Sequence, residues 1–351
     1  MKNENKEKPQ YYGIREIARR AKVSIGTVDR VIHNRKGVSE KTRLNIEKII
    51  KDLDYQPNVL ASRLASRKIY RIAVLVPSIS KETNFWNAPI QGIKRAAQEI
   101  KQYGVLIDYY FFQLGSRDSF LLQTEILLKK DVDGVLLAPL FKEDAGNFAA
   151  ICLKRKLPLV YIDDSLQDHT ALSYIGPNLA DSGKQAAQLF DFCSKENDKI
   201  LIANISWEID DYHIEQGFRT YFLEKGNTRQ VVKANIRQTD FPFIESSFDK
   251  IFDEHPDIKG IFVTNSRVGM VANFISNRKK PDVFIIGYDL TSDNIKFLKN
   301  GIINFLICHK PEEQGYLGIM AFYQHIVMGA AIKEVQYMPI DILTKYNYQF
   351  Y

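Results

Sequence analysis

Residues 13–34 constrain the fold of this chain more than any other segment. Apolar residues at helical spacing predict one short helix over about 14–21 and a second over about 24–33, separated by a three-residue break. Ser24 is suited to cap the second helix, because a serine hydroxyl accepts a hydrogen bond from a free backbone N–H. Two short helices joined by so tight a turn predict a helix-turn-helix, which lays its second helix in the DNA major groove.

The charge is unevenly distributed along the chain. Residues 1–70 carry 17 Lys and Arg against 8 Asp and Glu, a net charge of +9. The remaining residues carry 31 basic and 34 acidic side chains of the totals of 48 and 42, a net charge of −3. A basic head on a near-neutral body fits a polyanionic partner at one end only. On charge alone, a merely soluble, lysine-rich terminus is an equal alternative.

Cysteine usage and the N-terminus indicate the compartment. Cys152, Cys193 and Cys308 are widely spaced, lie in apolar segments and lack metal-ligand spacing, so we expect reduced core thiols and no metal or cofactor. Residues 1–10 are charged without an apolar signal-peptide core, and no apolar run is long enough to span a membrane. We therefore expect a cytoplasmic, nucleoid-associated protein with no membrane partner and a disordered lead over 1–12.

The rest of the head and the body have different textures. A third helix is expected from about 40 to 53, capped by Ser39, with Leu44 and Ile46 on its apolar side, and a short amphipathic segment over 59–66 follows. From Arg71 onwards, apolar runs typical of doubly covered parallel strands alternate with amphipathic stretches. The nine expected strands are 72–76, 105–112, 134–138, 157–162, 172–175, 200–205, 260–263, 283–287 and 303–308. The clearest helical stretches are 88–101, 118–130, 180–192 and 311–327.

The head contains, in order, the motifs Val23-Ser24, Thr27-Val28-x-Arg30-Val31, Val38-Ser39-x-Lys41-Thr42-Arg43, Tyr55-x-Pro57-Asn58 and Ala61-x-x-Leu64. With these motifs the chain resembles the LacI/GalR family of bacterial transcription regulators. The body resembles type I periplasmic-binding-protein sugar sensors through Phe85-Trp86, Gly134-Val135, Pro158-Leu159-Val160-Tyr161-Ile162-Asp163, Gly217-Phe218, Gly287-Tyr288-Asp289 and Pro311-x-x-x-Gly315. No apolar heptad repeat follows at the end of the chain, which favours a dimer over a tetramer.

The resemblance implies a small all-α helix-turn-helix DNA-binding domain over 13–56 and a hinge helix or linker over 57–69. It implies a two-lobed α/β domain, built on doubly wound parallel sheets, over 70–351. We expect the first lobe at about 70–176 and 310–337. The second lobe is expected at about 177–309 and 338–351.

The resemblance also assigns the DNA contacts. Arg30 takes a base-reading role, since arginine can donate twice to guanine, with a phosphate contact as the alternative. Leu64 is expected to wedge into the minor groove beside its dimer mate, with plain linker packing as the alternative. Asp29 departs from the usual serine, and it either pairs with a neighbouring basic residue or accepts from cytosine. The full expected set is Ser24, Ile25, Gly26, Thr27, Arg30, Ser39, Lys41, Thr42, Asn58, Ala61 and Leu64.

A sugar site combines aromatic faces with a few convergent polar groups. The residues that the resemblance assigns to ligand binding are Phe85, Trp86, Asp163, Asn178, Asn265, Asp289 and His309. Two positions depart from the family by lacking an arginine, namely Ile214 and Asp164, and His309 stands where glutamine is usual. The missing arginines weaken the case for an acidic or phosphorylated ligand and leave a neutral sugar or another polyol.

The expected function is a ligand-responsive regulator, a repressor that binds a palindromic operator as a homodimer and needs no cofactor. A sugar-active enzyme using Asp163, Asp164, Asp289 and His309 is one alternative, but the sequence holds no nucleophile motif, phosphate loop or metal cluster. A transport-type binding protein is the other, and it would need a secretion signal and no DNA head.

Overall fold

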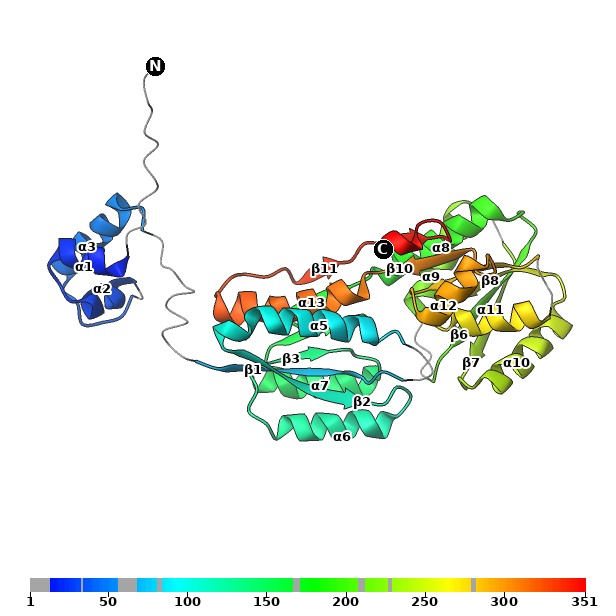
Figure 1. The fold of residues 1–351 in the computed structure, drawn as a ribbon, viewed down its shortest axis with the longest axis horizontal. Coiled ribbons are helices and arrows are strands. Elements are labelled where there is room, and N and C mark those ends of the chain that lie inside the picture. Colours follow the sequence, from blue (N-terminus) through cyan, green and yellow to red (C-terminus); the bar gives the residue numbers. More distant parts are fainter. Residues whose placement is uncertain are drawn as a thin grey trace, which may run out of the picture. The chain divides into compact units, whose positions relative to one another are not determined.

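The structure is a computed structural model, and it describes residues 13–32, 34–55, 68–80, 84–166, 171–207, 212–226, 229–278 and 282–351. The chain divides into two compact units, Met1–Arg67 and Lys68–Tyr351 (Figure 1). The predictions for the lead over 1–12 and for the hinge residues Asn58, Ala61 and Leu64 lie outside the described residues.

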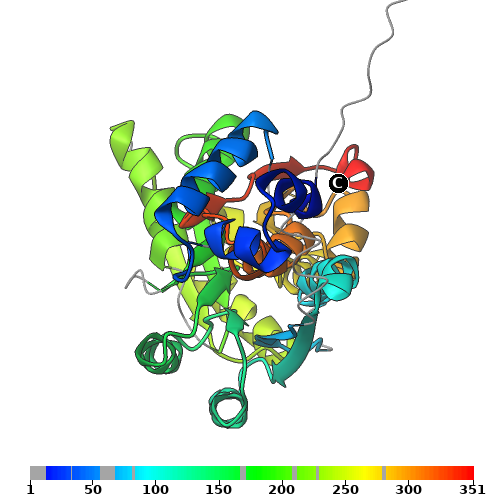
Figure 2. The ribbon, with the colours of Figure 1, turned by 90° about the vertical axis from the view of Figure 1, so that its left-hand side faces the viewer.

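The described residues of the first unit form helices around a small apolar core, and these helices are blue in Figure 2. They are α1 (Ile14–Ala21), α2 (Ile25–Ile32) and α3 (Glu40–Asp52). Each helix contributes one fully buried residue to this core, namely Ile17, Val28 and Ile46. The helix-turn-helix predicted from the sequence is therefore present, with Lys22 in the left-handed conformation (φ 55°) ending α1.

The prediction that Leu44 lies on the apolar face of α3 was wrong. Leu44 is 58% exposed, whereas Ile46 is fully buried. Two residues along a helix rotate the side chain by about 200°, so positions 44 and 46 cannot share a face. Leu44 therefore lies on the solvent side of α3.

The second unit begins with a parallel six-stranded sheet in the order β11-β5-β4-β3-β1-β2. Its strands are β1 (Tyr70–Pro77), β2 (Val105–Phe112), β3 (Gly134–Leu137), β4 (Leu159–Ile162), β5 (Ser173–Gly176) and β11 (Val335–Tyr337). One face is covered by α5 (Asn87–Ile100) and α13 (Pro311–Phe322), and the other by α6 (Arg117–Leu128) and α7 (Lys142–Lys154). A short 3₁₀ turn, Lys101–Tyr103, follows α5, and a π-helical turn, Tyr323–Val327, follows α13. We call this layer structure lobe 1.

A second six-stranded sheet, in the order β12-β10-β9-β8-β6-β7, forms lobe 2. Its strands are β6 (Lys199–Ile205), β7 (Val231–Ile236), β8 (Ile258–Val263), β9 (Phe284–Tyr288), β10 (Phe305–Cys308) and β12 (Asp341–Leu343). Its helices are α8 (Leu179–Cys193) and α9 (Tyr212–Glu224) on one face, and α10 (Phe241–Glu254), α11 (Val268–Asn277) and α12 (Ser292–Lys299) on the other. A 3₁₀ turn, Tyr348–Phe350, lies near the chain end.

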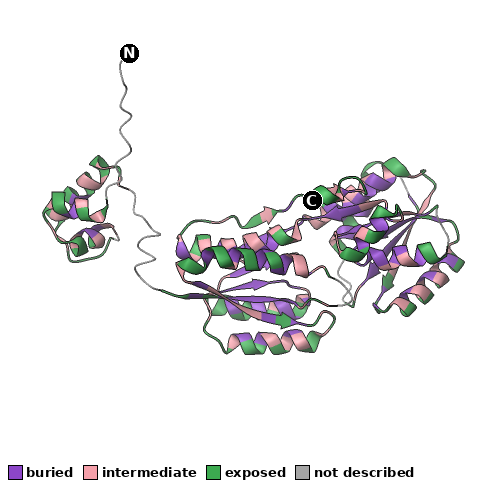
Figure 3. Ribbon diagram, in the orientation of Figure 1, coloured by how far each residue is buried: buried purple, intermediate pink, exposed green. Residues whose placement is uncertain are grey.

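The nine strands expected from apolar runs are all present, and the two-sheet α/β fold is confirmed. The sequence did not reveal β7, β11 and β12, and β12 runs antiparallel to β10 rather than parallel. Central strands such as β3 and β4 are buried throughout, whereas the edge strands β2 and β7 are only partly buried (Figure 3).

Each lobe contains one pair of helices packed unusually closely through glycine. A Cβ atom on Gly92 of α5 or Gly315 of α13 would lie 1.8 Å or 2.1 Å from a backbone oxygen of the facing helix. In lobe 2, a Cβ on Gly183 of α8 or Gly217 of α9 would lie 2.0 Å from such an oxygen in each case. Only hydrogen atoms fit between these helices, so the backbones touch and each pair forms a tight unit.

The chain passes between the lobes three times, after β5, after β10 and after β11. All three cysteines are free thiols, but Cys193 at the end of α8 is exposed, so the expectation of three core thiols was wrong for this residue. Among the described residues, no helix is both long and apolar enough to cross a bilayer. The same part of the chain holds no group of three or more His, Cys, Asp or Glu arranged to bind a metal ion.

Candidate nucleic-acid interface and ligand cleft

The N-terminus of α2 is built by a side-chain cap. Ser24 Oγ accepts from the backbone N–H of Thr27 at 3.1 Å, and the two hydroxyl oxygens lie 2.9 Å apart. The next helix repeats the arrangement, since Ser39 Oγ accepts from Thr42 N at 3.3 Å, with the hydroxyls 2.8 Å apart. Both helix starts therefore present hydroxyls and free backbone N–H groups, which are suited to phosphate oxygens.

The expected base-reading surface of α2 is open. Arg30 is exposed, and its side chain has no hydrogen bond or ion pair with the described residues. Ile25 is 46% exposed and Gly26 is exposed beside it, while Thr27 is half-buried. Lys41 is exposed at the start of α3. These residues share the solvent side of the helix-turn-helix, because Val28 and Val31 occupy its core side.

Asp29 forms an ion pair in the protein itself. Its Oδ2 accepts from Arg35 Nη1 at 3.2 Å in the turn after α2. Of the two alternatives that the sequence left open, the structure thus shows pairing with a neighbouring basic residue. The pair leaves Arg30 as the cation of α2 that points to solvent without a carboxylate partner among the described residues.

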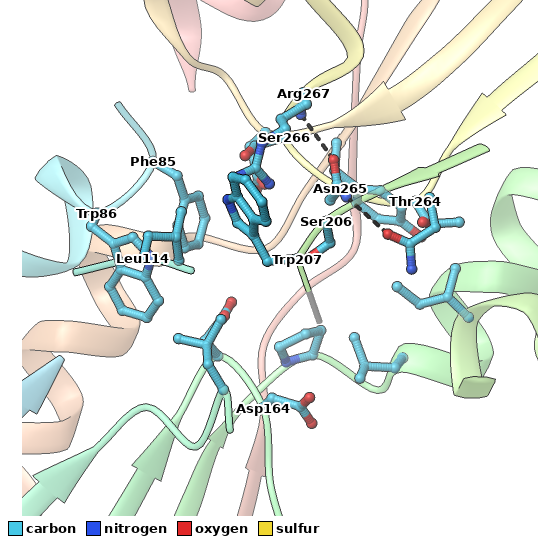
Figure 4. A pocket seen from close by; sticks show the side chains of 18 of the residues that line it. Phe85, Trp86, Leu114, Asp164, Ser206, Trp207, Thr264, Asn265, Ser266 and Arg267 are labelled. Carbon is cyan, nitrogen blue, oxygen red and sulfur yellow. Dashed lines mark hydrogen bonds between the residues drawn. The ribbon is translucent and has the colours of Figure 1, made fainter. Parts of the chain in front are cut away.

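A cleft of about 220 Å³ lies between the carboxyl ends of the strands of the two lobes. This is the position at which open α/β sheets bind ligands. The aromatic rings of Phe85 and Trp86 face that of Trp207 across it (Figure 4). Its lining includes six of the seven predicted ligand residues, namely Phe85, Trp86, Asp163, Asn265, Asp289 and His309.

The seventh, Asn178, lies outside the lining of this cleft. It is the N-cap of α8, where its Oδ1 accepts from Asp181 N at 3.2 Å and its Nδ2 donates to the Asp181 carboxylate at 2.6 Å. The structure thus gives Asn178 a helix-capping contact and brings the other six residues together.

Asp163 and Asp289 hold corresponding places in the two lobes. Each directly follows a central strand, β4 or β9, and each has a left-handed backbone, with φ 70° and 68°. Burial raises the pKa of Asp163 to about 7, with a further contribution from the neighbouring Asp164 carboxylate. Burial also raises the pKa of Asp289, and the negative charge of Asp163 raises it further. The carboxylate of Asp163 in lobe 1 thus acts electrostatically on Asp289 in lobe 2.

A chain of hydrogen bonds, which we call the crossover network, runs beneath the cleft from lobe 1 to lobe 2. The backbone N–H of Asp163 donates to Gln314 Oε1 at 2.9 Å, and Gln314 Nε2 donates to the backbone oxygen of His309 at 2.8 Å. His309 Nε2 lies 2.8 Å from Ser182 Oγ, which in turn lies 3.0 Å from the Tyr288 hydroxyl. Burial lowers the pKa of His309 to about 4, so its ring is neutral near pH 7.

Trp207 also bridges the lobes at the cleft. It follows β6 of lobe 2, and its indole packs on Gly115 of lobe 1, which has φ 82°. A Cβ atom at position 115 would lie 2.4 Å from Trp207 Cδ1, so only glycine permits this contact. Trp207 remains 44% exposed while lining the cleft.

Two basic side chains line the cleft, and both are engaged. Lys142 Nζ lies 2.6 Å from Asp164 Oδ2 and donates to the backbone oxygen of Ser165 at 2.8 Å. Arg267 is 7% exposed, and its Nη1 donates to the backbone oxygen of Ile205 at 3.1 Å. Asp164, which stands where sugar binders often have arginine, thus forms an ion pair at the rim.

Sequence reasoning missed Trp207, Gln314, Arg267 and Lys142. Trp207 follows a strand end, as Asn265 does, so strand-end position was a usable signal for it. Gln314 lies in the first turns of α13, beside the motif glycine Gly315, and gave no signal of its own. Ile214, at the position of a missing arginine, lines the cleft and is 8% exposed, so an apolar surface replaces a cation there.

Two family models match the chain. "Bacterial regulatory proteins, lacI family" matches residues 13–58, and "Periplasmic binding protein domain" matches residues 72–330. The chain belongs to the lacI family of bacterial regulatory proteins. Its fold is a helix-turn-helix head followed by a periplasmic-binding-protein domain.

Several family relatives are similar over different lengths. The HTH-type transcriptional regulator RegA of Clostridium acetobutylicum is 32% identical over 123 residues, so the match spans about a third of each chain, 35%. The ribose operon repressor of Halalkalibacterium halodurans is 26% identical over 290 residues, covering 79% of this chain and 80% of that one. A crystal structure of a LacI transcriptional regulator from Bacteroides fragilis has a TM-score of 0.76 at 28% identity, over 81% of this chain and 100% of that one.

Proposed function

We propose that this lacI-family protein is a repressor that binds a palindromic operator as a homodimer and is controlled by a small polyhydroxylated ligand, a sugar, in the cleft. The observation that carries the proposal is the cleft itself, whose six predicted ligand residues converge from both lobes. The head supports it with an open α2 surface that includes Arg30. The name of the relative from H. halodurans, a ribose operon repressor, agrees with a sugar as ligand.

The proposed DNA contacts divide into two kinds. Arg30 reads a base, while Ser24, Thr27, Ser39, Lys41 and Thr42 hold phosphates, with Ile25 and Gly26 against the groove surface. The bound phosphates position the head, and the base contact supplies sequence discrimination. Asn58, Ala61 and Leu64 are proposed to add minor-groove contacts.

The ligand is proposed to act by changing how the lobes meet. Its polar groups bind Asp163 of lobe 1 and Asp289 of lobe 2, and the aromatic rings hold its apolar faces. Closure around the ligand then changes the spacing of the two heads in the homodimer. Such coupling is typically about 1–3 kcal/mol and acts in both directions.

The DNA half of the proposal is tested with paired Arg30 variants. An operator is first selected from random DNA with the full chain, and binding is then measured by fluorescence anisotropy against single-base variants. Arg30→Ala and Arg30→Lys should both lose discrimination at one base position, by about 1–3 kcal/mol or roughly 5–150-fold, because lysine lacks the bidentate fork. If Arg30→Lys instead keeps full discrimination and only Arg30→Ala weakens all sequences alike, Arg30 contacts phosphate.

The ligand half is tested by thermal shift of the full chain against neutral sugars, sugar acids, sugar phosphates and purines. A ligand at 100 times its Kd stabilises the protein by about 2.7 kcal/mol, which is readily detected. Each ligand found is then added to the operator-binding assay. A sugar that binds without changing operator affinity would contradict the proposed control by ligand.

A further inference from the structure

The cleft contains two carboxyl groups that the protein leaves without a partner. Among the described residues, no donor lies within hydrogen-bond or ion-pair distance of the side-chain oxygens of Asp163 or Asp289. Both side chains line the cleft, one from each lobe. Both residues are half-buried, and a carboxylate that loses part of its water without gaining a partner is destabilised, so a ligand with donors would compensate these two groups.

Neither nearby cation is within ion-pair distance of these two groups. Lys142 is ion-paired with Asp164 and lowers the pKa of Asp163 only from a distance, and Arg267 donates to the neutral carbonyl of Ile205. His309 is hydrogen-bonded to Ser182 and its ring is neutral near pH 7. Neither carboxyl group therefore has a counter-charge from the described part of the chain in contact with it. Burial is the main cause of the raised pKa of both Asp163 and Asp289.

The walls of the cleft suit a cation as well as a sugar ring. Phe85, Trp86 and Trp207 line the same cleft as the two carboxyl groups, and Figure 4 shows these three side chains. The faces of such rings attract ammonium groups within about 6 Å, most strongly for tryptophan. They also pack on the apolar C–H faces of a sugar, so one ring system can hold both parts of an amino sugar.

We propose that the ligand of this cleft is an amine-bearing monosaccharide whose protonated amine lies between the carboxylates of Asp163 and Asp289. One ammonium group offers three donors and a positive charge, so it binds both lobes at once. A neutral sugar supplies donors without the charge, and a sugar acid or phosphate adds repulsion. The inference rests on the proposed function only in taking the cleft as the ligand site.

The test uses matched pairs of probes on the full chain. Binding of D-glucosamine, D-galactosamine and D-mannosamine is compared by isothermal titration calorimetry with that of D-glucose, D-galactose and D-mannose at pH 6.5. We expect the amine of at least one pair to bind 10-fold or more tightly than its parent sugar. Equal or weaker binding of the amines in every pair overturns the proposal, as does binding of a sugar acid or sugar phosphate in preference, or no binding by any amine.

The variants Asp163→Asn and Asp289→Asn locate the effect. Asparagine tolerates a left-handed backbone, so both variants keep the geometry and remove only the charge. Each should reduce the preference for the amine to less than threefold. Asp253→Asn, an exposed position on α10 outside the cleft lining, should leave the preference unchanged. A preference that survives both cleft variants would overturn the assigned position of the amine.

The outcomes also separate this inference from the proposed function. A neutral sugar that binds best and changes operator affinity overturns the inference and leaves the regulator standing. An amino sugar that binds through Asp163 and Asp289 but leaves operator affinity unchanged supports the inference and contradicts the proposed control of DNA binding.

Discussion

Two aspartates, 163 and 289, show how one residue type is placed identically in both lobes. Each ends a buried strand and turns the chain through a left-handed conformation, which aspartate tolerates better than most residues. Both carboxyl groups line the cleft, where burial raises their pKa values, with a further contribution from Asp164 for Asp163 and from Asp163 for Asp289. Their protonation is therefore linked to the stability of the protein without ligand.

The pKa of about 7 for Asp163 makes the sign of this linkage testable. The folded state binds more protons than the unfolded state between about pH 4 and 7, so the unfolding free energy falls as pH rises through that window. The Asp163→Asn variant lacks this proton linkage. We expect its unfolding free energy to exceed that of the wild type by about 1–2 kcal/mol at pH 8 and by less at pH 5. Urea unfolding at the two pH values measures the difference.

The comparison of wild type and variant isolates Asp163 from other titrating groups. His309 has a lowered pKa, about 4, so its own contribution has the opposite sign and is lost as pH falls from about 6.5 through 4. It is present equally in both proteins. A variant with the same pH dependence as the wild type would show that the folded and unfolded pKa values of Asp163 are equal.

Gly115 gives a second prediction at this scale. Gly115→Ala places a methyl group 2.4 Å from the Trp207 ring, so the indole must leave the lobe 1 surface. In a Trp86→Phe background, Trp207 is the only tryptophan of the chain, and its quenching by acrylamide should increase in the Gly115→Ala variant. Gly226→Ala is the matched control, because Gly226 also has a positive φ, 69°, but open space around it. Equal quenching in the two glycine variants would exclude the steric contact.

Secondary-structure elements differ in how much of them the sequence reveals. The buried strands produce continuous apolar runs, which is why nine of them could be predicted. β7 lies at a sheet edge and includes Lys233 and Asn235, and β11 and β12 have three residues each, so none of these carries a clear periodic signal. Elements at an edge depend on neighbours that are distant in sequence.

The site follows the same division. Asp163, Asn265, Asp289 and His309 could be predicted because strand ends meet at one edge of a parallel sheet. Contacts such as Trp207 on Gly115 join residues 92 positions apart through the meeting of two lobes. Neither composition nor periodicity specifies such a contact. The missing arginine at Ile214 was visible in the sequence, but the cations that actually line the cleft were not.

The glycine-packed helix pairs give a prediction at the scale of elements. Gly217→Ala places a methyl group 2.0 Å from the Ala180 backbone oxygen and forces α8 and α9 apart. We expect a loss of about 1–3 kcal/mol or more in unfolding free energy, as for overpacked cores. Gly146→Ala, within α7 and with open space around it, should instead stabilise by about 0.5–1 kcal/mol, because alanine favours a helix.

Chemical unfolding followed by circular dichroism measures both glycine variants under the same conditions. The opposite signs of the two effects are the sharp expectation, since both changes add one methyl group to a helix. Stabilisation by Gly217→Ala would show that α8 and α9 are not in backbone contact.

At the scale of the whole molecule, the two units have separate apolar cores. We therefore expect two transitions in differential scanning calorimetry of the full chain, a small one for the head and a large one for the body. A cleft ligand at 100 times its Kd should add about 2.7 kcal/mol to the body alone and leave the head transition in place. A single cooperative transition shifted as a whole would indicate strong coupling between the units.

Three chain crossings join the lobes, and at the second of them the backbone is held by a hydrogen bond. Lys310, at the second crossing, has a left-handed backbone with φ 52°, and its N–H donates to the Tyr351 hydroxyl at 2.6 Å. Two stiff blocks connected by three short links in parallel cannot slide or twist freely past each other. The relative motion available to them reduces to bending about one axis through the links. A single angle between lobe 1 and lobe 2 would then describe every state of the body. Any ligand of the cleft would act on the rest of the molecule only by changing that angle.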